Sequence, residues 1–150
     1  MSAVLPIICL ARHGETAWSL SGQHTGLTDL PLTERGELNA QSLGRRLRGI
    51  TFAKVFTSPL KRAVRTCELA GFGGKAESDR HLLEWNYGQY EGRRTREIHE
   101  QRPGGNCFAT VVLEEKHRIR SAPGPIASWT ALATSRATSC CFRAGISSGF

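Results

Sequence analysis

The sequence predicts an α/β fold with a mostly parallel central sheet flanked by helices, incomplete at the C-terminus. Three observations carry this prediction. Apolar runs of strand length alternate with longer segments of helical spacing over residues 1–103. The first apolar run is continuous, as in a strand buried on both faces. Residues 104–150 are rich in small and basic residues and keep little of either periodicity, so the alternation stops there.

The first predicted strand is Val4 to Leu10, which ends in a turn. Thr33 is a suitable N-cap for a helix whose apolar residues recur at helical spacing, and Gly49 ends that pattern. The residues on its apolar face are Ala40, Leu43, Leu47 and Ile50. A strand followed by a helix is the first unit of a parallel α/β sheet.

A second short strand is predicted at Lys54 to Thr57. Ser58 and Pro59 follow as the expected cap and first position of another helix. Its apolar side is expected to contain Ala63, Cys67 and Ala70. We further predict a short strand at 81–84 and a short polar helix at 95–101.

Length and composition favour one compact domain with a small anionic partner. The chain has 150 residues, a net charge of +7 and a pI near 9.6. Such a balance also suits nucleic acid or a membrane surface, but there is no run of like charge and no aromatic-basic patch. No segment predicts a transmembrane span or a secretory signal, and the five cysteines lack zinc spacing. We therefore expect a cytoplasmic protein that binds no nucleic acid, membrane or metal.

Arg12, His13 and Gly14 directly follow the first predicted strand. Parallel sheets bind ligands at the carboxyl ends of their strands. A neutral imidazole there can attack phosphorus and split one hard transfer into two easier steps. Arg12 can donate to phosphate oxygens, and Gly14 can let the backbone approach an anion closely. On its own, such a pair more often marks an ordinary surface turn.

Two later residues suit the same chemistry. Arg62 lies in the first turn of the second predicted helix, where the helix N-terminus favours an anion. Glu84 stands beside Trp85 and could act as general acid toward a leaving oxygen. The plainer alternatives are a solvated arginine and a strand-end carboxylate.

Together these residues fall in four segments that resemble the histidine phosphatase superfamily, also called phosphoglycerate mutase-like. The segments are LARHGETAWS at 10–19, GQHTGLTDLPLTERGE at 22–37, FTSPLKRAVRT at 56–66 and LLEWNYGQYEG at 82–92. They occur in family order, and the resemblance covers residues 4–103.

The resemblance implies a role for each matching residue. It implies His13 as the nucleophile, Arg12 and Arg62 as phosphate ligands, and Glu84 as the proton donor. It also places Ser19, Thr25 and Gly26 near the substrate and gives Glu15 and Thr16 a part in shaping the loop. The family needs no metal, so no cofactor is expected.

The second and fourth segments are most like a branch that includes yeast sedoheptulose-1,7-bisphosphatase and bacterial probable phosphoglycerate mutases. The substrate expected from this resemblance is a small phosphate monoester such as a sugar phosphate or bisphosphate. Three functions stay open: a phosphatase or mutase, an inactive remnant that only binds phosphate esters, and a basic interaction module for nucleic acid.

The family also has a second catalytic histidine, in a Gly-His segment after a late apolar strand, and His117 lies in no such setting. One hypothesis is a shifted reading frame from about Gly104 onward. Codons can be chosen for residues 137–150 that spell DVLLFSSGHFLRV from the third base, and for residues 104–116 that spell WQLFRDGCPGGE. Both strings resemble the family at those points.

This hypothesis divides the chain in two: residues 1–103 as the N-terminal part of the family domain, and residues 104–150 as a frameshifted, poorly ordered tail. It predicts that the tail lacks the strand that should lie beside the first strand. It also predicts partial folding and weak or no phosphatase activity.

Overall fold

The computed structural model describes residues 7–101 and 139–143 of the chain. Its sheet has four strands in the order β1-β4-β2-β3, and every neighbouring pair is parallel. The strands are β1 (Ile8–Arg12), β2 (Lys54–Thr57), β3 (Ala76–Ser78) and β4 (Ser139–Arg143). The predicted α/β class with a parallel sheet is confirmed.

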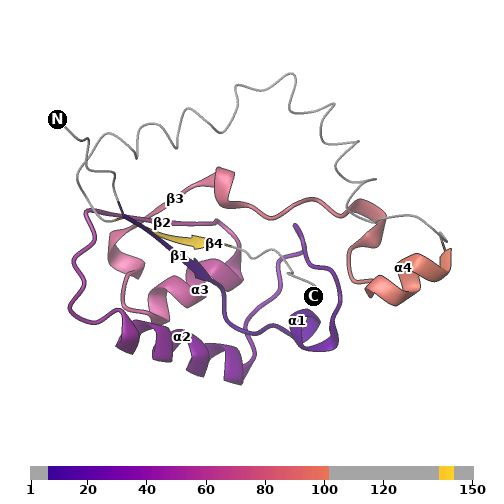
Figure 1. Ribbon diagram of the computed structural model, residues 1–150, viewed down its shortest axis with the longest axis horizontal. Coiled ribbons are helices and arrows are strands. Elements are labelled where there is room, and N and C mark those ends of the chain that lie inside the picture. The colour runs from indigo at the N-terminus through magenta and orange to yellow at the C-terminus, as the bar shows by residue number, and fades with distance from the viewer. Residues whose placement is uncertain (1–6, 102–138, 144–150) are drawn as a thin grey trace, which may run out of the picture.

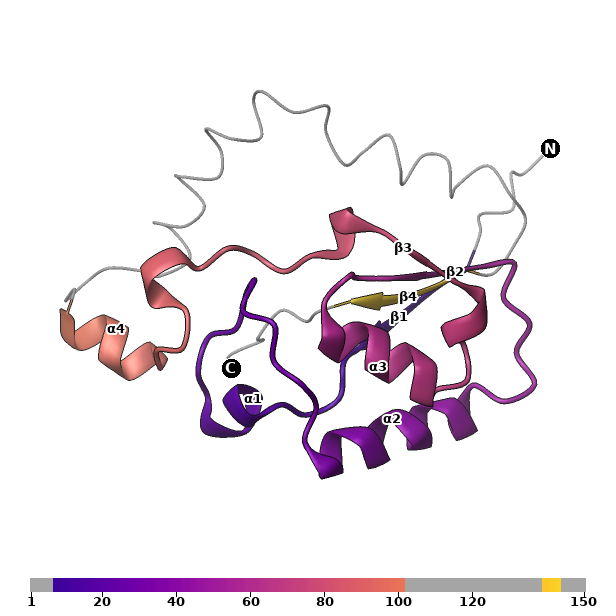
Figure 2. The ribbon, with the colours of Figure 1, turned by 180° about the vertical axis from the view of Figure 1, so that it is seen from behind.

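Two of the helices cover one face of this sheet, as Figures 1 and 2 show for α2 and α3. Both views place α4 away from the sheet, beyond α1. The α-helices are α1 (Ala17–Ser21), α2 (Glu34–Arg46), α3 (Lys61–Leu69) and α4 (Thr95–Gln101). Short 3-10 turns are η1 (Gly73–Lys75), η2 (Arg80–Leu82) and η3 (Gly88–Tyr90).

The start of α2 follows from local chemistry, as predicted, but the helix ends at Arg46, before the predicted end at Gly49, and Ile50 is exposed. Thr33 is the N-cap, and its side-chain oxygen accepts from the Gly36 amide at 3.0 Å. Acidic residues occupy the first turn and basic residues the last, which suits the helix dipole. Gly49 then adopts a φ of 86°, a left-handed conformation that favours glycine.

The core lies between the sheet and the pair α2 and α3. Its buried members come from β1, β2, α3 and the C-cap positions of α2 and α3: Ala11, Leu47, Val55, Cys67 and Ala70. This cluster packs α2 and α3 against the sheet. The positions of the two helices in turn fix the loops that follow β1 and β2.

β1 differs from its prediction in position and in burial. Val4 to Leu10 was expected as a strand buried on both faces, but β1 spans Ile8–Arg12, and residues 4–6 lie outside the described part. Leu10 is 65% exposed, whereas Ala11 is 4% exposed. The prediction of full burial is wrong because, among the described elements, α2 and α3 cover only one face of the sheet, and alternate side chains of β1 point to the other face.

The expectation that the tail supplies no strand beside the first strand is also wrong. Within 104–150, Ser139–Arg143 forms β4, which pairs with β1 on one side and with β2 on the other. The sequence SCCFR gives little local indication of a strand. Pairing with β1 on one side and β2 on the other stabilises β4 in place of a strong strand propensity. For the rest of the tail, outside the described residues, poor order stays a prediction, as does the boundary at residue 103.

Two other boundaries are set by contacts that the local sequence does not show. α3 begins at Lys61 with Leu60 as N-cap, not at Pro59 with a Ser58 cap. The Lys61 amide donates at 2.8 Å to the Asp29 carboxylate, so a distant loop caps this helix. The predicted strand at 81–84 is wrong, because η2 occupies 80–82 and the strand is the more polar 76–78. The helix predicted at 95–101 is confirmed as α4.

Candidate active site

The candidate site lies at the carboxyl ends of β1 and β2, which share one edge of the sheet because the strands are parallel. His13 directly follows β1, and Arg62 is the second residue of α3, which follows β2. The parallel arrangement therefore brings the first and third sequence segments to one place.

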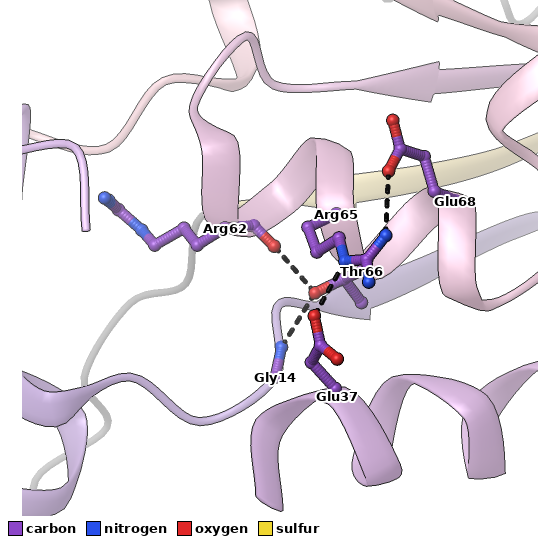
Figure 3. A network of polar contacts seen from close by, with 6 residues as sticks. All are labelled: Gly14, Glu37, Arg62, Arg65, Thr66 and Glu68. Carbon is purple, nitrogen blue, oxygen red and sulfur yellow. Dashed lines mark hydrogen bonds and ion pairs between the residues drawn. The ribbon is translucent and has the colours of Figure 1, made fainter. Parts of the chain in front are cut away.

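A hydroxyl from α3 fixes the turn that holds His13. The Gly14 amide donates at 3.0 Å to the Thr66 hydroxyl, and that hydroxyl donates at 2.7 Å to the Arg62 carbonyl (Figure 3). Gly14 is buried, and a Cβ on it would collide with the Gly36 carbonyl of α2. Gly14 thus serves close packing of the turn on α2, a reason that the sequence analysis did not give.

The next two residues shape this turn as predicted. The Glu15 carbonyl accepts from the Thr33 amide at 2.9 Å, which ties the turn to the start of α2. Thr16 is fully buried and caps α1 in a reciprocal box with Ser19. The Ser19 hydroxyl therefore has a structural role as the partner of Thr16. Its expected role near the substrate stays a prediction.

His13 is held as a neutral imidazole with one defined tautomer. Its Nδ1 lies 2.6 Å from the Gly14 carbonyl oxygen, which can only accept, so Nδ1 carries the proton and Nε2 keeps a lone pair. The pKa of His13 is lowered to about 4, mainly by burial and also by the charges of Arg62 and Arg12, while the Gly14 hydrogen bond acts in the opposite direction. A neutral Nε2 is the form that can attack an electrophile.

Arg62 is fully buried and is bound to the loop that follows α1. Its Nη1 donates to the Thr28 carbonyl at 2.8 Å and its Nη2 to the Gly26 carbonyl at 2.7 Å. Within the described residues its Nε is buried and has no hydrogen-bond partner. Burial lowers the pKa of Arg62, and the charge of Glu84 opposes this most strongly. The predicted bidentate phosphate contact of Arg62 stays a prediction, and in this structure each Nη atom donates one hydrogen bond to a loop carbonyl.

Glu84 is 4% exposed, and its Oε1 accepts from the Trp85 amide at 3.1 Å. The charge of Glu84 acts on Arg62, and the charge of Arg62 acts on His13. Glu84 is thus placed in the same electrostatic group as the predicted nucleophile. Its role as proton donor stays a prediction.

Four predicted site residues line a pocket of about 90 Å³: Arg12, His13, Ser19 and Thr25. Arg12, His13 and Ser19 also line a second hollow of about 370 Å³ with Gly14 and Glu15. The other three predicted residues, Gly26, Arg62 and Glu84, are buried and line neither hollow. The predicted site residues therefore form two groups. One group lines the pocket, and the other is buried and includes the ionisable residues Arg62 and Glu84.

Sequence reasoning missed three residues of this region: His24, Thr66 and Glu91. His24 lines the 90 Å³ pocket, and its Nε2 lies 3.1 Å from the Thr95 hydroxyl. Burial lowers the pKa of His24. Thr66 and Glu91 act through hydrogen bonds to residues far away in sequence, which no local pattern announces.

The described part of the chain shows no metal site and no membrane span. Among residues 7–101 and 139–143, no three His, Cys, Asp or Glu side chains gather where they could hold a metal ion. None of the helices in these ranges is long and apolar enough to cross a membrane. The expected cytoplasmic location and the expected lack of nucleic-acid and membrane partners stay predictions.

The fold and the site define an α/β protein with a histidine-centred pocket at the carboxyl edge of a parallel sheet. The chain belongs to the histidine phosphatase superfamily, branch 1, whose family model matches residues 8–107. This confirms the resemblance on which the sequence analysis relied.

Curated relatives are named as phosphatases or mutases. The chain is 42% identical over 117 residues to sedoheptulose 1,7-bisphosphatase of Saccharomyces cerevisiae, which covers 68% of the chain and 43% of that relative. It is 42% identical over 98 residues to an acid phosphatase of Mycobacterium tuberculosis, covering 64% of the chain and 48% of the relative. The chain thus spans less than half the length of these two relatives.

Solved structures agree on the fold. A structure of an open reading frame from Mycobacterium tuberculosis matches with a TM-score of 0.75 and 31% identity, covering 92% of this chain and 73% of that one. Phosphoserine phosphatase of Entamoeba histolytica, solved with 3-phosphoglyceric acid, matches with a TM-score of 0.68 and 26% identity over the same shares.

Proposed function

We propose that the chain transfers a phosphoryl group from a small phosphate monoester to His13 and then to water. The observation that carries this proposal is the His13 imidazole, which is neutral, has its Nδ1 proton on the Gly14 carbonyl and lines a pocket with Arg12. Its free Nε2 lone pair is what a phosphohistidine-forming nucleophile needs.

The two half-reactions balance with the residues present. His13 Nε2 attacks phosphorus and the bond from phosphorus to the ester oxygen breaks. The leaving oxygen takes a proton from Glu84, which in this proposal is in its protonated form when the substrate is bound. The Arg12 guanidinium donates charge-assisted hydrogen bonds to the phosphate oxygens. Water then attacks phosphorus, Glu84 takes back a proton, and the N–P bond breaks to release phosphate and neutral His13.

A sugar phosphate or bisphosphate is the proposed substrate class. Support comes from the name of the Saccharomyces cerevisiae relative, a sedoheptulose bisphosphatase. Transfer between positions of a phosphoglycerate is the alternative, since a Bifidobacterium longum relative that is 37% identical over 101 residues is named a phosphoglycerate mutase.

We further propose that this chain turns over slowly. The supporting observation is Arg62, whose two terminal nitrogens hold loop carbonyls and which lines neither hollow beside His13. The frameshift hypothesis gives a second reason, the missing Gly-His segment. Sequencing the coding DNA across Pro103 to Gly105 and on past Phe150 tests that hypothesis, which fails if the bases do not encode the family-like strings.

Activity is tested with p-nitrophenyl phosphate and with phosphorylated sugars. We expect slow release of phosphate and an acid-labile, base-stable phosphoryl group on the chain, both of which need His13. Turnover that continues without His13 would refute the proposal. Phosphate binding without any turnover would favour the inactive remnant.

A further inference from the structure

Glu91 holds a loop that lies far from it in sequence. Its Oε1 accepts from the Leu27 amide at 2.9 Å, and its Oε2 accepts from the Thr28 amide at 3.2 Å and the Thr28 hydroxyl at 2.6 Å. One carboxylate therefore takes three donors from two adjacent residues of the loop at 26–28.

Arg62 holds the same loop by its carbonyls. The guanidinium donates to the carbonyls of Gly26 and Thr28, while Glu91 accepts from the amides of Leu27 and Thr28. The loop is thus fixed by an anion on its donor groups and by a cation on its acceptor groups. Both are charge-assisted hydrogen bonds, which are stronger than those between neutral groups.

Close packing leaves this loop little freedom. A Cβ on Gly26 would collide with the Trp85 carbonyl and with the Glu91 carboxylate. The segment 85–91 therefore lies directly against the loop. Thr25, the neighbouring residue, lines the pocket beside His13.

The Glu91 carboxylate suits a structural anion and not a proton donor. Burial by itself would raise the pKa of Glu91, but hydrogen bonds from the Thr28 side chain and from the loop amides outweigh burial and lower the pKa. Glu91 lines neither hollow beside His13, so it is placed to act through other groups.

We propose that Glu91 is a positioning residue for phosphate binding, which fixes the loop at 26–28 and through it sets the place of Thr25 and the direction of the Arg62 guanidinium. This inference rests on the proposed function, since it requires an anion beside His13. Of the residues that this arrangement fixes, Thr25 is the one that lines the pocket beside His13, where such an anion would bind.

The first test measures the dissociation constant of orthophosphate by calorimetry on the full chain. Glu91→Gln keeps the shape but places an amide NH₂ against loop donors, and we expect it to weaken phosphate binding about tenfold. Glu100→Gln is the matched control, because this exposed α4 carboxylate contacts Arg96 and not the loop. It should bind phosphate within about twofold of the wild type.

A second pair of variants keeps the test valid if Glu91→Gln does not fold. Thr28→Val removes the 2.6 Å hydrogen bond to Glu91 and leaves both backbone amides in place. We expect binding about threefold weaker, and Thr28→Ser, which restores a hydroxyl, should recover most of it. Equal binding by Thr28→Val and the wild type would count against the proposal.

A double-mutant cycle separates positioning from general stability. If Glu91 acts through the loop and Arg62, then Glu91→Gln in an Arg62→Lys background should cost much less than tenfold. Amide exchange at Leu27 and Thr28 should also be about tenfold faster in Glu91→Gln. Fully additive losses, or unchanged exchange, would overturn the inference.

Arg12→Ala distinguishes this inference from the proposed function. If Arg12→Ala weakens phosphate binding and Glu91→Gln does not, only the role of Glu91 is overturned. If the wild type binds no orthophosphate, or binds it equally well without Arg12, the proposed function falls and the inference falls with it.

Discussion

The turn after β1 and the turn after β2 both supply an arginine to the site, yet they hold it in opposite ways. Arg12 is exposed and lines both hollows beside His13. Arg62 is fully buried, and its terminal nitrogens hold the carbonyls of Gly26 and Thr28. The same residue type therefore serves as a ligand candidate in one turn and as a structural clamp in the other.

This difference shows what a motif can convey. A motif indicates which side chains gather at a strand end, but it does not show which donors are already occupied. The turn after β1 combines a local cap, the Thr16 and Ser19 box, with a distant hydrogen bond from the Gly14 amide to the Thr66 hydroxyl. Arg62 depends on carbonyls 34 and 36 positions away.

The largest expected effect tests whether the chemistry belongs to the turn after β1. His13→Ala should lower turnover of p-nitrophenyl phosphate by about 10³-fold or to background, because it removes the Nε2 lone pair that is proposed to attack phosphorus. His81→Ala is the control, since His81 is exposed and pairs with Asp79. Similar rates for the two variants would place the chemistry elsewhere.

Stability measurements should separate the two arginines next. Arg62→Ala is expected to lower the free energy of unfolding by about 3 kcal/mol, because it takes the donors away from the Gly26 and Thr28 carbonyls and removes the cation that acts on Glu84. Arg12→Ala, at an exposed position, should change it by less than about 0.5 kcal/mol. Urea unfolding measures the free energy of unfolding of both variants. Equal losses of this free energy would contradict the different roles inferred for Arg12 and Arg62.

The pH profile reports on the electrostatic link between the turns. With a pKa of about 4, His13 stays neutral at pH 5.5, where an ordinary histidine would be about nine-tenths protonated. After correction for ionisation of the ester, kcat/KM should therefore be about tenfold higher at pH 5.5 than a pKa of 6.5 allows. A fall of kcat/KM centred near pH 6.5 would show that burial and the two arginines do not act as inferred.

The same lowered pKa has a consequence for stability. The unfolded chain binds a proton on this histidine below about pH 6.5, whereas the folded chain resists it until about pH 4. The contribution of neutral His13 to stability is therefore full above pH 6.5 and is lost as the pH falls toward 4.

The smallest effect concerns the hydroxyl that joins the two turns. Thr66→Val removes the acceptor of the Gly14 amide and the donor to the Arg62 carbonyl, and we expect a loss of about 1–2 kcal/mol in unfolding free energy. Thr66→Ser keeps the hydroxyl and should lose less. If Thr66→Val were as stable as Thr66→Ser, the joining hydrogen bonds would contribute nothing measurable.

Local chemistry made part of this structure predictable. The cap at Thr33, the strand at 54–57 and the helix at 95–101 depend on neighbouring residues and are confirmed. The start of α3 was predicted two residues early, because the Asp29 carboxylate that caps it lies far away in sequence. β4 was missed for the same kind of reason, since its two neighbours in the sheet create it more than its own residues do.

The site divides in the same way. His13, Arg12, Ser19 and Thr25 were found from motifs and share one pocket. Thr66 and Glu91 were not found, because each acts by a hydrogen bond across more than fifty positions of chain. Such contacts depend on how whole helices and strands pack together. A single sequence does not show this packing.

The place of β4 between β1 and β2 also dictates an order of events during synthesis. Ile8 pairs with Ser139, and Lys54 pairs with the same residue from the other side. While a ribosome is still making the stretch before Ser139, β1 and β2 have no strand to join them, and contacts of such long range form slowly. The edges of β1 and β2 that pair with β4 therefore stay without it until Ser139–Arg143 has been made. Unpaired strand edges promote aggregation, so this is the period in which a chaperone would act on the nascent chain.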